Sequence, residues 1–457
     1  MGFLLLACLG LVVLTYQLSF DPQRSSMKEK VSNFFNKIAS WNDHNDEFFT
    51  EQHIFSEEAT VAFLAKNIIQ TGDTINLRMF GTGKVNLFVE YFDESGTLHS
   101  TEEKNISISS DVPETFSSFY GFEGSFDEIL ITPKIDNGWV DVGVNPEFGR
   151  RINLPVLIEN TKSREVLFVE STDTLNAYVS AYDLPTHYDR KSAPLGAFTR
   201  PVAMPQNYDI KNFTESNEVN CKDHLINADL VHKQMINDLN YSIGQISDEF
   251  LDEYENLAGV KVLIFGAHNE YWTEAKAENI LRFVTNGGHL LFLGGNTAWR
   301  KVKRGRKFDA IFGSNLLSHG FDRLIREVLG TYYDINGYDT YSSFKLIETK
   351  APEWMDPASF VNTSSFGVGT DFECCEGLIG GASGLETDKL LPESKEEFTI
   401  IAKGNNWFNG GADIVSRKFP SGGTVLNFGS VALWHRTQDQ TIRALVKQFL
   451  DNALLIE

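Results

Sequence analysis

Two side chains that can bind a metal or move a proton, His268 and Glu270, stand two residues apart in segment 266–272, GAHNEYW. The segment directly follows the apolar run 262–265, VLIF, which predicts a buried strand. A strand that ends at Gly266 places the next side chains at the carboxyl edge of a sheet, where open α/β sheets bind ligands. An imidazole beside a carboxylate there can ligate a metal or act as a general base. A helix N-terminus stabilised by Glu270 explains the same pattern equally well.

Other polar residues follow neighbouring predicted strands. Segment 294–299, GGNTAW, comes after the apolar strand 289–293, and its two glycines allow the backbone to approach a ligand closely. Asn296 offers both a donor and an acceptor. If the two strands are neighbours in a parallel sheet, Asn296 lies beside His268. Asp413 is a further candidate acid near the last strand, although a solvated loop residue is the more ordinary interpretation.

Tyrosines follow the first strand of the same region. Tyr178 and Tyr182 come shortly after the apolar run 166–169, so their hydroxyls could point toward the same sheet edge. An aromatic rim that closes this edge is the simpler explanation for either tyrosine alone. The basic run 301–307, KVKRGRK, could hold an anion, but a solvated loop or an intramolecular partner for acidic side chains fits it better.

Several enzyme classes are excluded by motif. The chain has no Gly-x-Ser-x-Gly elbow, no P-loop and no dinucleotide glycine fingerprint. The turn at 266–270 carries His268 and Glu270 where a glutaminase of the amidotransferase type has a cysteine. The four cysteines (Cys8, Cys221, Cys374 and Cys375) have no zinc-binding spacing, and at most one disulfide, from Cys221 to one of the adjacent pair, is expected.

Composition limits the partners. With 457 residues, 42% of them hydrophobic, the chain is long enough for more than one packed core. The formal net charge of -22 disfavours nucleic acid and anionic lipid as partners. Residues 1–20 are apolar and predict a signal peptide or signal anchor, and residues 21–45 predict a stalk or linker helix. Four glycosylation sequons, at Asn105, Asn212, Asn240 and Asn362, agree with export.

The remaining chain divides into two predicted domains. Residues 46–154 show short alternating strands separated by turn signals such as Gly81-Thr82-Gly83, which predicts an antiparallel, immunoglobulin-like β-sandwich. In residues 155–457 strands alternate with helices, which predicts a doubly wound, mostly parallel α/β domain. Thr273 is expected to cap the helix that follows segment 266–272.

Several of these segments together resemble the N,N-dimethylformamidase large (beta) subunit family. The resemblance includes segments 266–272, 286–288 and 293–297, the upstream segment 171–182 and the C-terminal segments 411–413 and 420–434. It covers roughly residues 60–457, and segment 266–272 is its most specific part. It implies a class I glutamine amidotransferase-like, flavodoxin-like domain and amide hydrolysis.

The resemblance also implies a metal centre. In that family two tyrosines and a glutamate hold a ferric ion. By resemblance, Glu270 is the carboxylate ligand, Tyr178 is one tyrosine, and Tyr208 or Tyr188 is the other. Phenolate and carboxylate oxygens are hard donors that suit iron(III). His268, Asn296 and Asp413 are then the expected catalytic residues. The family's enzyme works with a small partner subunit, of which this chain shows no sign.

The leading hypothesis is an exported or membrane-anchored, metal-dependent hydrolase of a linear amide. The expected partner is a small-molecule amide, with membrane contact only through the N-terminal segment; self-association into a homo-oligomer stays open. The alternative is a non-catalytic, cell-surface binding or structural protein with the same fold. A glycan hydrolase would need paired carboxylates across a cleft, which a sequence cannot place.

Overall fold

The computed structural model describes residues 60–92, 98–100, 104–110, 126–147, 151–160, 165–178, 226–303, 309–311, 321–337, 340–347, 351–360, 363–369, 380–407 and 410–455. All of them belong to one compact unit, Thr50–Glu457. The predicted signal and stalk segments, all four cysteines, Tyr182, Tyr188 and Tyr208 lie outside the described residues. No helix in the described part of the chain is long and apolar enough to span a membrane.

The first sheet is almost entirely antiparallel. Within the described ranges it contains β1 (Val61–Leu64), β2 (Ile68–Gln70), β3 (Ile75–Phe92), β4 (Leu98–Ser100), β5 (Lys104–Ser110), β6 (Asp127–Ile131), β7 (Gly138–Pro146) and β8 (Ile152–Glu159). Only β2 and β8 pair in parallel. The alternating apolar side chains of β3, β7 and β8 form its buried core.

The predicted turn at Gly81-Thr82-Gly83 is wrong, because β3 runs through it as one strand of 18 residues. The first part of β3 pairs with β1 and β6, and the later part pairs with β5 and β7. Gly81 and Gly83 have φ values of 121° and 119°, which other residues rarely adopt. The glycines therefore allow the strand to change partners without ending.

The second sheet has the strand order β10 (Gly244–Ser247), β9 (Val166–Glu170), β11 (Val262–Phe265), β13 (His289–Phe292), β24 (Thr424–Asn427), β23 (Asp413–Lys418), β22 (Thr399–Gly404), β18 (Phe344–Leu346) and β19 (Ser365–Phe366) among the described residues. The first five strands are parallel to one another. The others pair antiparallel. The expected parallel order thus holds for five strands, because the short connections between β22, β23 and β24 leave no room for crossover helices.

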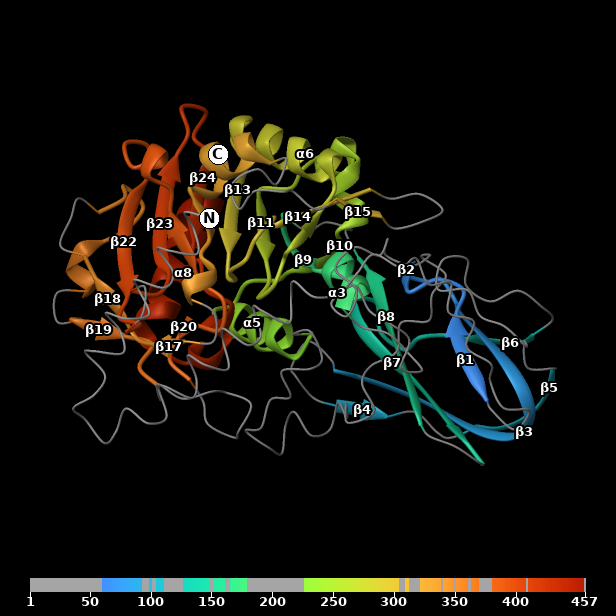
Figure 1. Cartoon of the computed structure of the whole chain (residues 1–457). Helices are drawn as coiled ribbons and strands as arrows, with labels where there is room; N and C mark the ends of the chain where they lie inside the picture. Colours follow the sequence, from blue (N-terminus) through green and yellow to red (C-terminus); the bar gives the residue numbers. More distant parts are fainter. Residues whose placement is uncertain are drawn as a thin grey trace, which may run out of the picture. The chain divides into compact units, whose positions relative to one another are not determined.

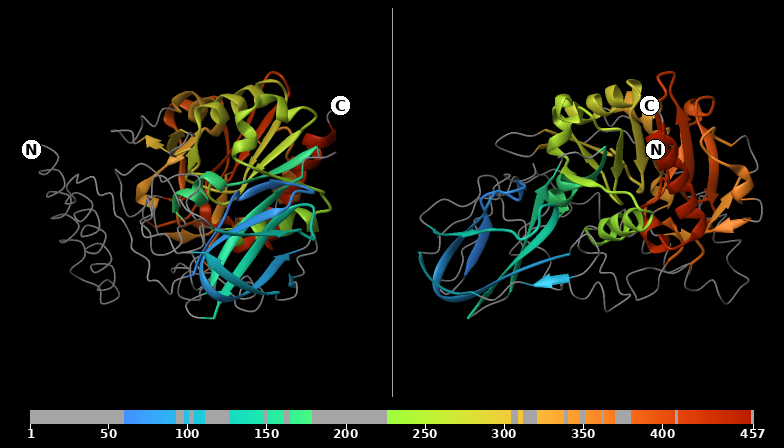
Figure 2. Two further views of the ribbon diagram at one scale, coloured as in Figure 1. Left: turned by 90° about the vertical axis from the view of Figure 1, so that its right-hand side faces the viewer. Right: turned by 180° about the vertical axis from the view of Figure 1, so that it is seen from behind.

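Helices cover both faces of the parallel strands (Figure 1). α6 (Glu274–Thr285) packs on one face, whereas α5 (Ile226–Asp238) and α8 (Gln440–Leu455) pack on the other. Figure 2 shows α6 and α8 from two further directions. Thr273 caps α6 as predicted, since its hydroxyl accepts a hydrogen bond from the Lys276 N–H at 3.0 Å. Between β10 and β11 the chain forms two 3₁₀ turns, η2 (Glu249–Asp252) and η3 (Tyr254–Leu257).

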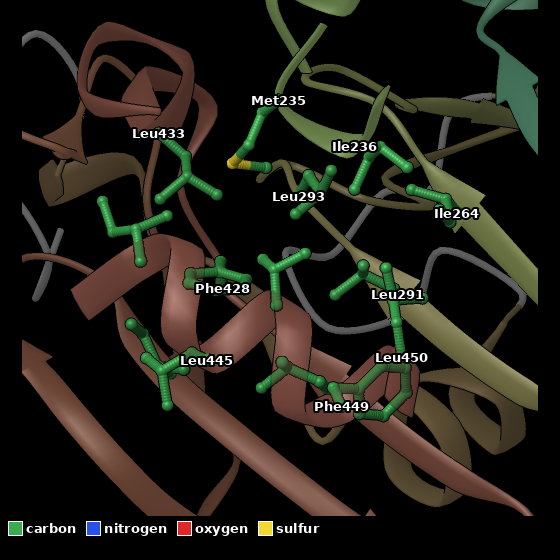
Figure 3. Packing of buried hydrophobic residues seen from close by; sticks show 14 of the residues in the cluster. Met235, Ile236, Ile264, Leu291, Leu293, Phe428, Leu433, Leu445, Phe449 and Leu450 are labelled. Carbon is green, nitrogen blue, oxygen red and sulfur yellow. The ribbon is translucent and has the colours of Figure 1, made fainter. Parts of the chain in front are cut away.

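Close packing fixes the helices against the strands. Figure 3 shows Leu291 of β13 beside Leu450 of α8, and Ile264 of β11 beside Ile236 of α5. Each of these side chains is almost completely buried. Burying an apolar side chain of this size contributes about 1.5–3 kcal/mol, so this layer holds the strand ends firmly in place.

The remaining elements are short. They are α3 (Thr172–Tyr178), β12 (Tyr271–Trp272), β14 (Arg300–Lys303), β15 (Asp309–Ile311), α7 (Asp322–Leu324), η4 (Ile325–Leu329), β16 (Thr331–Tyr333), η5 (Ile335–Gly337), β17 (Tyr341–Ser342), η6 (Pro357–Phe360), β20 (Ser383–Gly384), β21 (Asp388–Leu390), η8 (Pro392–Ser394) and η9 (Val431–Arg436). The fold is mixed α/β and dominated by its sheets.

Candidate functional site

Strand β11 ends in a crowded turn. Asp229 of α5 accepts a hydrogen bond from the Ala267 N–H at 2.7 Å. A Cβ atom on Gly266 would lie 2.0 Å from the same carboxylate oxygen. Gly266 is therefore required because a helix carboxylate occupies the space that any side chain would need. This contact fixes the direction in which the chain enters segment 267–270.

His268 lies between two carboxylates. Its Nε2 atom is 3.2 Å from Glu386 Oε2 and 3.6 Å from Glu270 Oε2, and the imidazole is 7% exposed. Burial alone would lower the pKa of His268, but the negative charges of Glu386, Glu270 and Asp229 outweigh it and raise the pKa above its usual value. This imidazole can hold a proton and pass it to a neighbouring group.

Glu270 is held by its main chain and its carboxylate. The hydroxyl of Thr174, on α3, accepts hydrogen bonds from the N–H groups of Glu270 and Tyr271 at 3.0 and 3.2 Å. Arg300 Nε donates to Glu270 Oε1 at 3.3 Å. The carboxylate is 3% exposed, and a buried negative charge needs a positive partner. Arg300 and the charged form of His268 supply it.

Asn296 reaches the same point from the next strand, as predicted from the order of β11 and β13. His268 and Gly295 form a parallel bridge, and Asn296 Nδ2 lies 3.4 Å from His268 Nε2. The same Nδ2 donates to Glu386 Oε2 at 2.9 Å. A Cβ on Gly294 would lie 2.2 Å from the Ala267 carbonyl oxygen. The glycines therefore permit close contact between backbones, and not only a tight turn.

Asp388 lies beneath the Asn296 turn. Its Oδ1 accepts the Asn296 N–H at 2.8 Å, and the side chain is almost fully buried. Burial, with a smaller contribution from Glu386, raises the pKa of Asp388 to about 7, although bonds from the Asn296 and Thr297 N–H groups and the charge on His268 act the other way. We call His268, Glu270, Asn296, Glu386 and Asp388 the His268 cluster.

Backbone strain is concentrated around this cluster. Four non-glycine residues in the described ranges have positive φ, and three of them are Asn296 at 51°, Ala298 at 55° and Leu385 at 63°. Such conformations cost about 1–2 kcal/mol each and persist where the surrounding structure enforces them. They are found preferentially at functional sites, which favours a functional role for the turns that carry Asn296 and Glu386.

Buried polar atoms without hydrogen-bond partners also favour a functional role for this cluster. Within the described residues, Asn296 Oδ1 is buried without a hydrogen-bond partner, and so are both side-chain polar atoms of Asn269. An unsatisfied buried polar group costs about 1–3 kcal/mol. Because Asn296 Nδ2 donates to the Glu386 carboxylate, the free atom of its amide is the acceptor. A ligand donor would satisfy it.

Of the other predicted site residues, the structure describes Tyr178 and Asp413 but not Tyr208. Tyr178 is the last residue of α3, and Tyr208 lies outside the described residues. Asp413 is buried at the start of β23, so the expectation of a solvated loop residue is wrong. Its Oδ2 accepts the Leu390 N–H at 2.9 Å, and its Oδ1 lies 3.8 and 3.7 Å from Lys389 and Lys403.

The basic run has an intramolecular partner. Lys301 Nζ lies 3.0 Å from the Glu274 carboxylate, as one of its two simpler interpretations predicts. Residues 304–307 of the run lie outside the described part of the chain.

Glu386 and Asp388 were missed by sequence reasoning. They precede and begin the short strand β21, which belongs to neither large sheet, so no alternation of strands and helices marks them. The signal available was two carboxylates spaced by one residue before an apolar pair, a pattern that many surface loops share. Asp229 and Thr174 were also missed, because each lies on a helix that contacts the site from outside its own segment.

A metal would have to be held by oxygen donors. In the described ranges no three His, Cys, Asp or Glu side chains are grouped to hold a metal ion. Glu270 supplies one buried carboxylate oxygen, which suits a hard cation, and tyrosines would have to supply the other ligands. Of the three ligands expected for iron(III), one glutamate and two tyrosines, the glutamate ligand is therefore the one that the described site supplies.

Comparisons with known proteins give a family match and several distant solved structures. No curated protein matches the chain. A solved thua-like protein from Bacteroides uniformis ATCC 8492 aligns with a TM-score of 0.34 and 12% identity, over 65% of this chain and 95% of that one. The mmIFT52 N-terminal domain aligns with a TM-score of 0.28 and 15% identity, over 49% of this chain and 90% of that one. These TM-scores are too low to define a shared fold.

The family match covers the turns of His268 and Asn296. Residues 128–314 match the family described as N,N-dimethylformamidase beta subunit-like, C-terminal. The match includes strands β9, β11 and β13, helices α5 and α6, and three members of the His268 cluster. The resemblance drawn from the sequence is thereby confirmed over residues 128–314, the part of the chain that is similar to the N,N-dimethylformamidase beta subunit-like, C-terminal family.

Proposed function

We propose that this chain hydrolyses the carbon–nitrogen bond of a linear amide at the His268 cluster. The observation that carries the proposal is an imidazole held between two carboxylates, with His268 Nε2 at 3.2 Å from Glu386 and 3.6 Å from Glu270. The family match, which suggests a dimethylformamidase-like hydrolase, supports the same reaction. A hydrolase needs a group that takes a proton from water and a group that returns one to the leaving nitrogen.

The cluster contains candidates for both tasks. Glu386 is 16% exposed, which makes it more open than Glu270, and its position 3.2 Å from His268 Nε2 suits it to take a proton from water. The water oxygen then bonds to the carbonyl carbon. His268, whose pKa is raised, donates its proton to the nitrogen as the carbon–nitrogen bond breaks. The products are a carboxylic acid and an amine.

Asn296 is suited to hold the substrate. Its Oδ1 is buried and unpartnered among the described residues, so it can accept a hydrogen bond from an N–H group. Its Nδ2 is occupied by Glu386, which fixes the orientation of the amide. We propose Asp413 as an assisting residue that acts through β21, because its Oδ2 holds the main chain of Leu390.

We further propose that iron(III) is bound by Glu270, Tyr178 and Tyr208. Glu270 is a buried, hard oxygen donor. Tyr178 follows Thr174 by four residues on α3, which is one helical turn from the residue that holds the Glu270 main chain. A bound ferric ion would supply Lewis acidity that polarises an amide carbonyl and acidifies water.

We also propose a finer fold assignment and export of the protein. Five parallel strands with helices on both faces support an amidotransferase-like, flavodoxin-like domain over residues 155–457. The antiparallel first sheet supports an immunoglobulin-like domain over residues 46–154. Exposed asparagines in two sequons, Asn105 and Asn240, support a secreted or membrane-tethered location, with the apolar segment 1–20 as the signal or anchor.

The test combines turnover with metal content. The purified full-length chain is incubated with formamide, N-methylformamide and N,N-dimethylformamide, and the release of ammonia or amine is followed while iron is measured by elemental mass spectrometry. We expect hydrolysis and near-stoichiometric iron in the wild type and the loss of both in Glu270→Gln. The control is Glu274→Gln, which removes an exposed carboxylate four residues away. Wild-type protein with neither iron nor turnover would favour the alternative, a non-catalytic binding or structural protein.

A further inference from the structure

Asn296 is held from two sides by one short segment. Glu386 accepts a hydrogen bond from its side-chain amide at 2.9 Å, and Asp388 accepts one from its main-chain N–H at 2.8 Å. Asp388 also receives the N–H of Thr297. Two carboxylates separated by one residue therefore fix both the side chain and the backbone of Asn296.

The turn that carries Asn296 needs such support. Asn296 and Ala298 have φ values of 51° and 55°, in the left-handed region that disfavours residues with a Cβ. Gly294 and Gly295, which precede them, contribute no side-chain packing. Hydrogen bonds from the main chain to a buried carboxylate are roughly twice as strong as those between neutral groups. Asp388 can therefore keep the turn in its left-handed conformation.

Asp388 is itself firmly anchored. Its N–H donates to the Gly429 carbonyl at 2.8 Å, directly after β24 of the central sheet. A Cβ on Gly429 would lie 3.3 Å from Asp388 Cβ and 3.0 Å from the Asp413 carbonyl oxygen, so the chain at Asp388 packs closely against Gly429 near the end of β24 and the start of β23. The contact thus links the Asn296 turn to the rigid part of the sheet.

We propose that Asp388 is a positioning residue whose carboxylate fixes turn 294–297 and so keeps Asn296 and the Glu386–His268 contact in working geometry. Its effect on turnover rests on the proposed function, whereas its effect on the turn does not. The side chain of Asp388 acts only through the backbone of Asn296 and Thr297, so it need not touch a substrate.

The strength of the hydrogen bonds that Asp388 accepts depends on whether its carboxyl group is protonated. Around it lie Glu386 on its own segment, His268 beyond the turn, Tyr333 opposite it on β16 and Asp413 on β23. Burial raises the pKa of Asp388 to about 7, so the ionised carboxylate becomes the more abundant form as the pH rises above 7. A neutral carboxyl is the weaker acceptor. The turn should therefore be held more tightly above pH 7 than below it.

Hydrogen–deuterium exchange of the full-length protein tests this directly. Protection factors of the Asn296 and Thr297 amides are measured at pH 6 and pH 8 by mass spectrometry with site-resolved fragmentation. In the wild type we expect protection to rise with pH. In Asp388→Ala it should fall about tenfold at pH 8. Asp388→Asn keeps an acceptor but cannot ionise, so it should retain part of the protection and lose the pH dependence.

A matched control separates this effect from general loosening. Asp439 accepts the N–H groups of Gly367 and Thr441 at 2.7 and 2.8 Å, away from the His268 cluster. Asp439→Ala should expose the Gly367 amide and leave Asn296 and Thr297 protected. Equal protection of these two amides in the wild type and Asp388→Ala would overturn the proposal, and so would pH dependence that persists in Asp388→Asn.

Turnover of formamide gives the link to function. If the wild type is active, kcat should fall at least tenfold in Asp388→Ala with little change in KM, and Asp388→Asn should recover part of it. An unchanged kcat in Asp388→Ala would overturn the positioning role. An inactive wild type that still shows the expected exchange pattern would instead count against the proposed amide hydrolysis and leave the contact between Asp388 and the turn supported.

Discussion

Two buried groups of charged side chains lie at the ends of parallel strands, and they are built differently. In the first, which we call the Glu170 cluster, Glu170 at the end of β9 accepts hydrogen bonds from Trp139 at 2.9 Å and Lys233 at 2.5 Å. Lys233 also donates to Gln245 at 2.8 Å. No side-chain atom of this cluster is among the unpartnered buried atoms of the described residues. The His268 cluster has an unpartnered acceptor, strained backbone and an excess of carboxylates.

The difference shows that burial of charge does not by itself mark a site. The Glu170 cluster joins α5 and β10 of the second sheet to Trp139 on β7 of the first, so its bonds stabilise packing. The His268 cluster leaves hydrogen-bonding capacity unused and places three carboxylates around one imidazole. Features that reduce stability without an evident structural gain are expected where function demands them. Substitutions in the Glu170 cluster should therefore reduce stability, whereas substitutions in the His268 cluster should reduce turnover.

The largest effect is expected from Glu386→Gln on turnover. Glutamine preserves the size of the side chain and an acceptor for Asn296, but it cannot take a proton from water. We expect kcat/KM for amide hydrolysis to fall by about 10²- to 10⁴-fold, the usual range for a general base. The melting temperature should stay the same or rise, because one of several like charges is removed. Unchanged turnover would remove Glu386 from the mechanism.

The next effect concerns stability and pH. The pKa of Asp388 is about 7 in the folded protein and about 3.8 when exposed, so the folded state binds more protons between these values. The free energy of unfolding should therefore fall as pH rises from about 4 to 7, by on the order of 4 kcal/mol from this group.

Chemical denaturation of the wild type and Asp388→Asn across this range gives the contribution by difference. The pKa of His289 is lowered by burial to about 4, which makes stability rise with pH over part of the same window. That contribution is present in both proteins and cancels. Parallel pH profiles for the two proteins would contradict the buried, proton-binding state of Asp388.

A smaller loss of stability is expected when the Glu170 cluster is broken. Lys233→Met leaves Glu170 buried without its cation, which typically costs 3–5 kcal/mol. Burial already raises the pKa of Glu170, so the carboxyl can take up a proton, and we expect about 3 kcal/mol. Lys447→Met removes an exposed helical ion pair with Asp451 and should cost under about 0.5 kcal/mol. Equal unfolding free energies for both variants would show that the buried pair is not structural.

The smallest stability effect separates function from folding. Asn296→Gly relieves a left-handed φ of 51° and removes the unpartnered acceptor, but it loses the bond to Glu386. We expect the unfolding free energy to change by less than about 1 kcal/mol while turnover falls. Asn240→Gly relieves a similar φ of 67° in an exposed turn and should leave turnover unchanged. Equal activity of the two variants would mean that the amide of Asn296 has no role.

Much of the parallel region could be predicted from the sequence. The strands that end at Phe265 and Phe292 are apolar and are separated by an amphipathic helix with a clear cap at Thr273, so their order and their shared edge followed from local pattern. This adjacency was sufficient to place Asn296 beside His268. The resemblance of segment 266–272 led to the family that residues 128–314 match.

What could not be predicted depends on contacts between distant segments. Glu386 and Asp388 reach the site from a strand about 90 residues beyond Asn296, and no periodic pattern records that approach. Gly81 was predicted to lie in a turn because a glycine in the sequence looks the same whether a strand ends there or changes partners. The burial of Asp413 depends on β21, which the sequence also did not reveal.

The most direct test of the account is ammonia release from formamide by the purified full-length chain, measured for the wild type beside His268→Gln. If the His268 cluster is the hydrolytic site, the wild type releases ammonia and formate in equal amounts, and the variant loses at least 99% of this activity, the lower limit of about 10²-fold expected for an acid–base residue, while keeping its melting temperature. Wild-type activity that survives in His268→Gln would place the chemistry elsewhere in the chain.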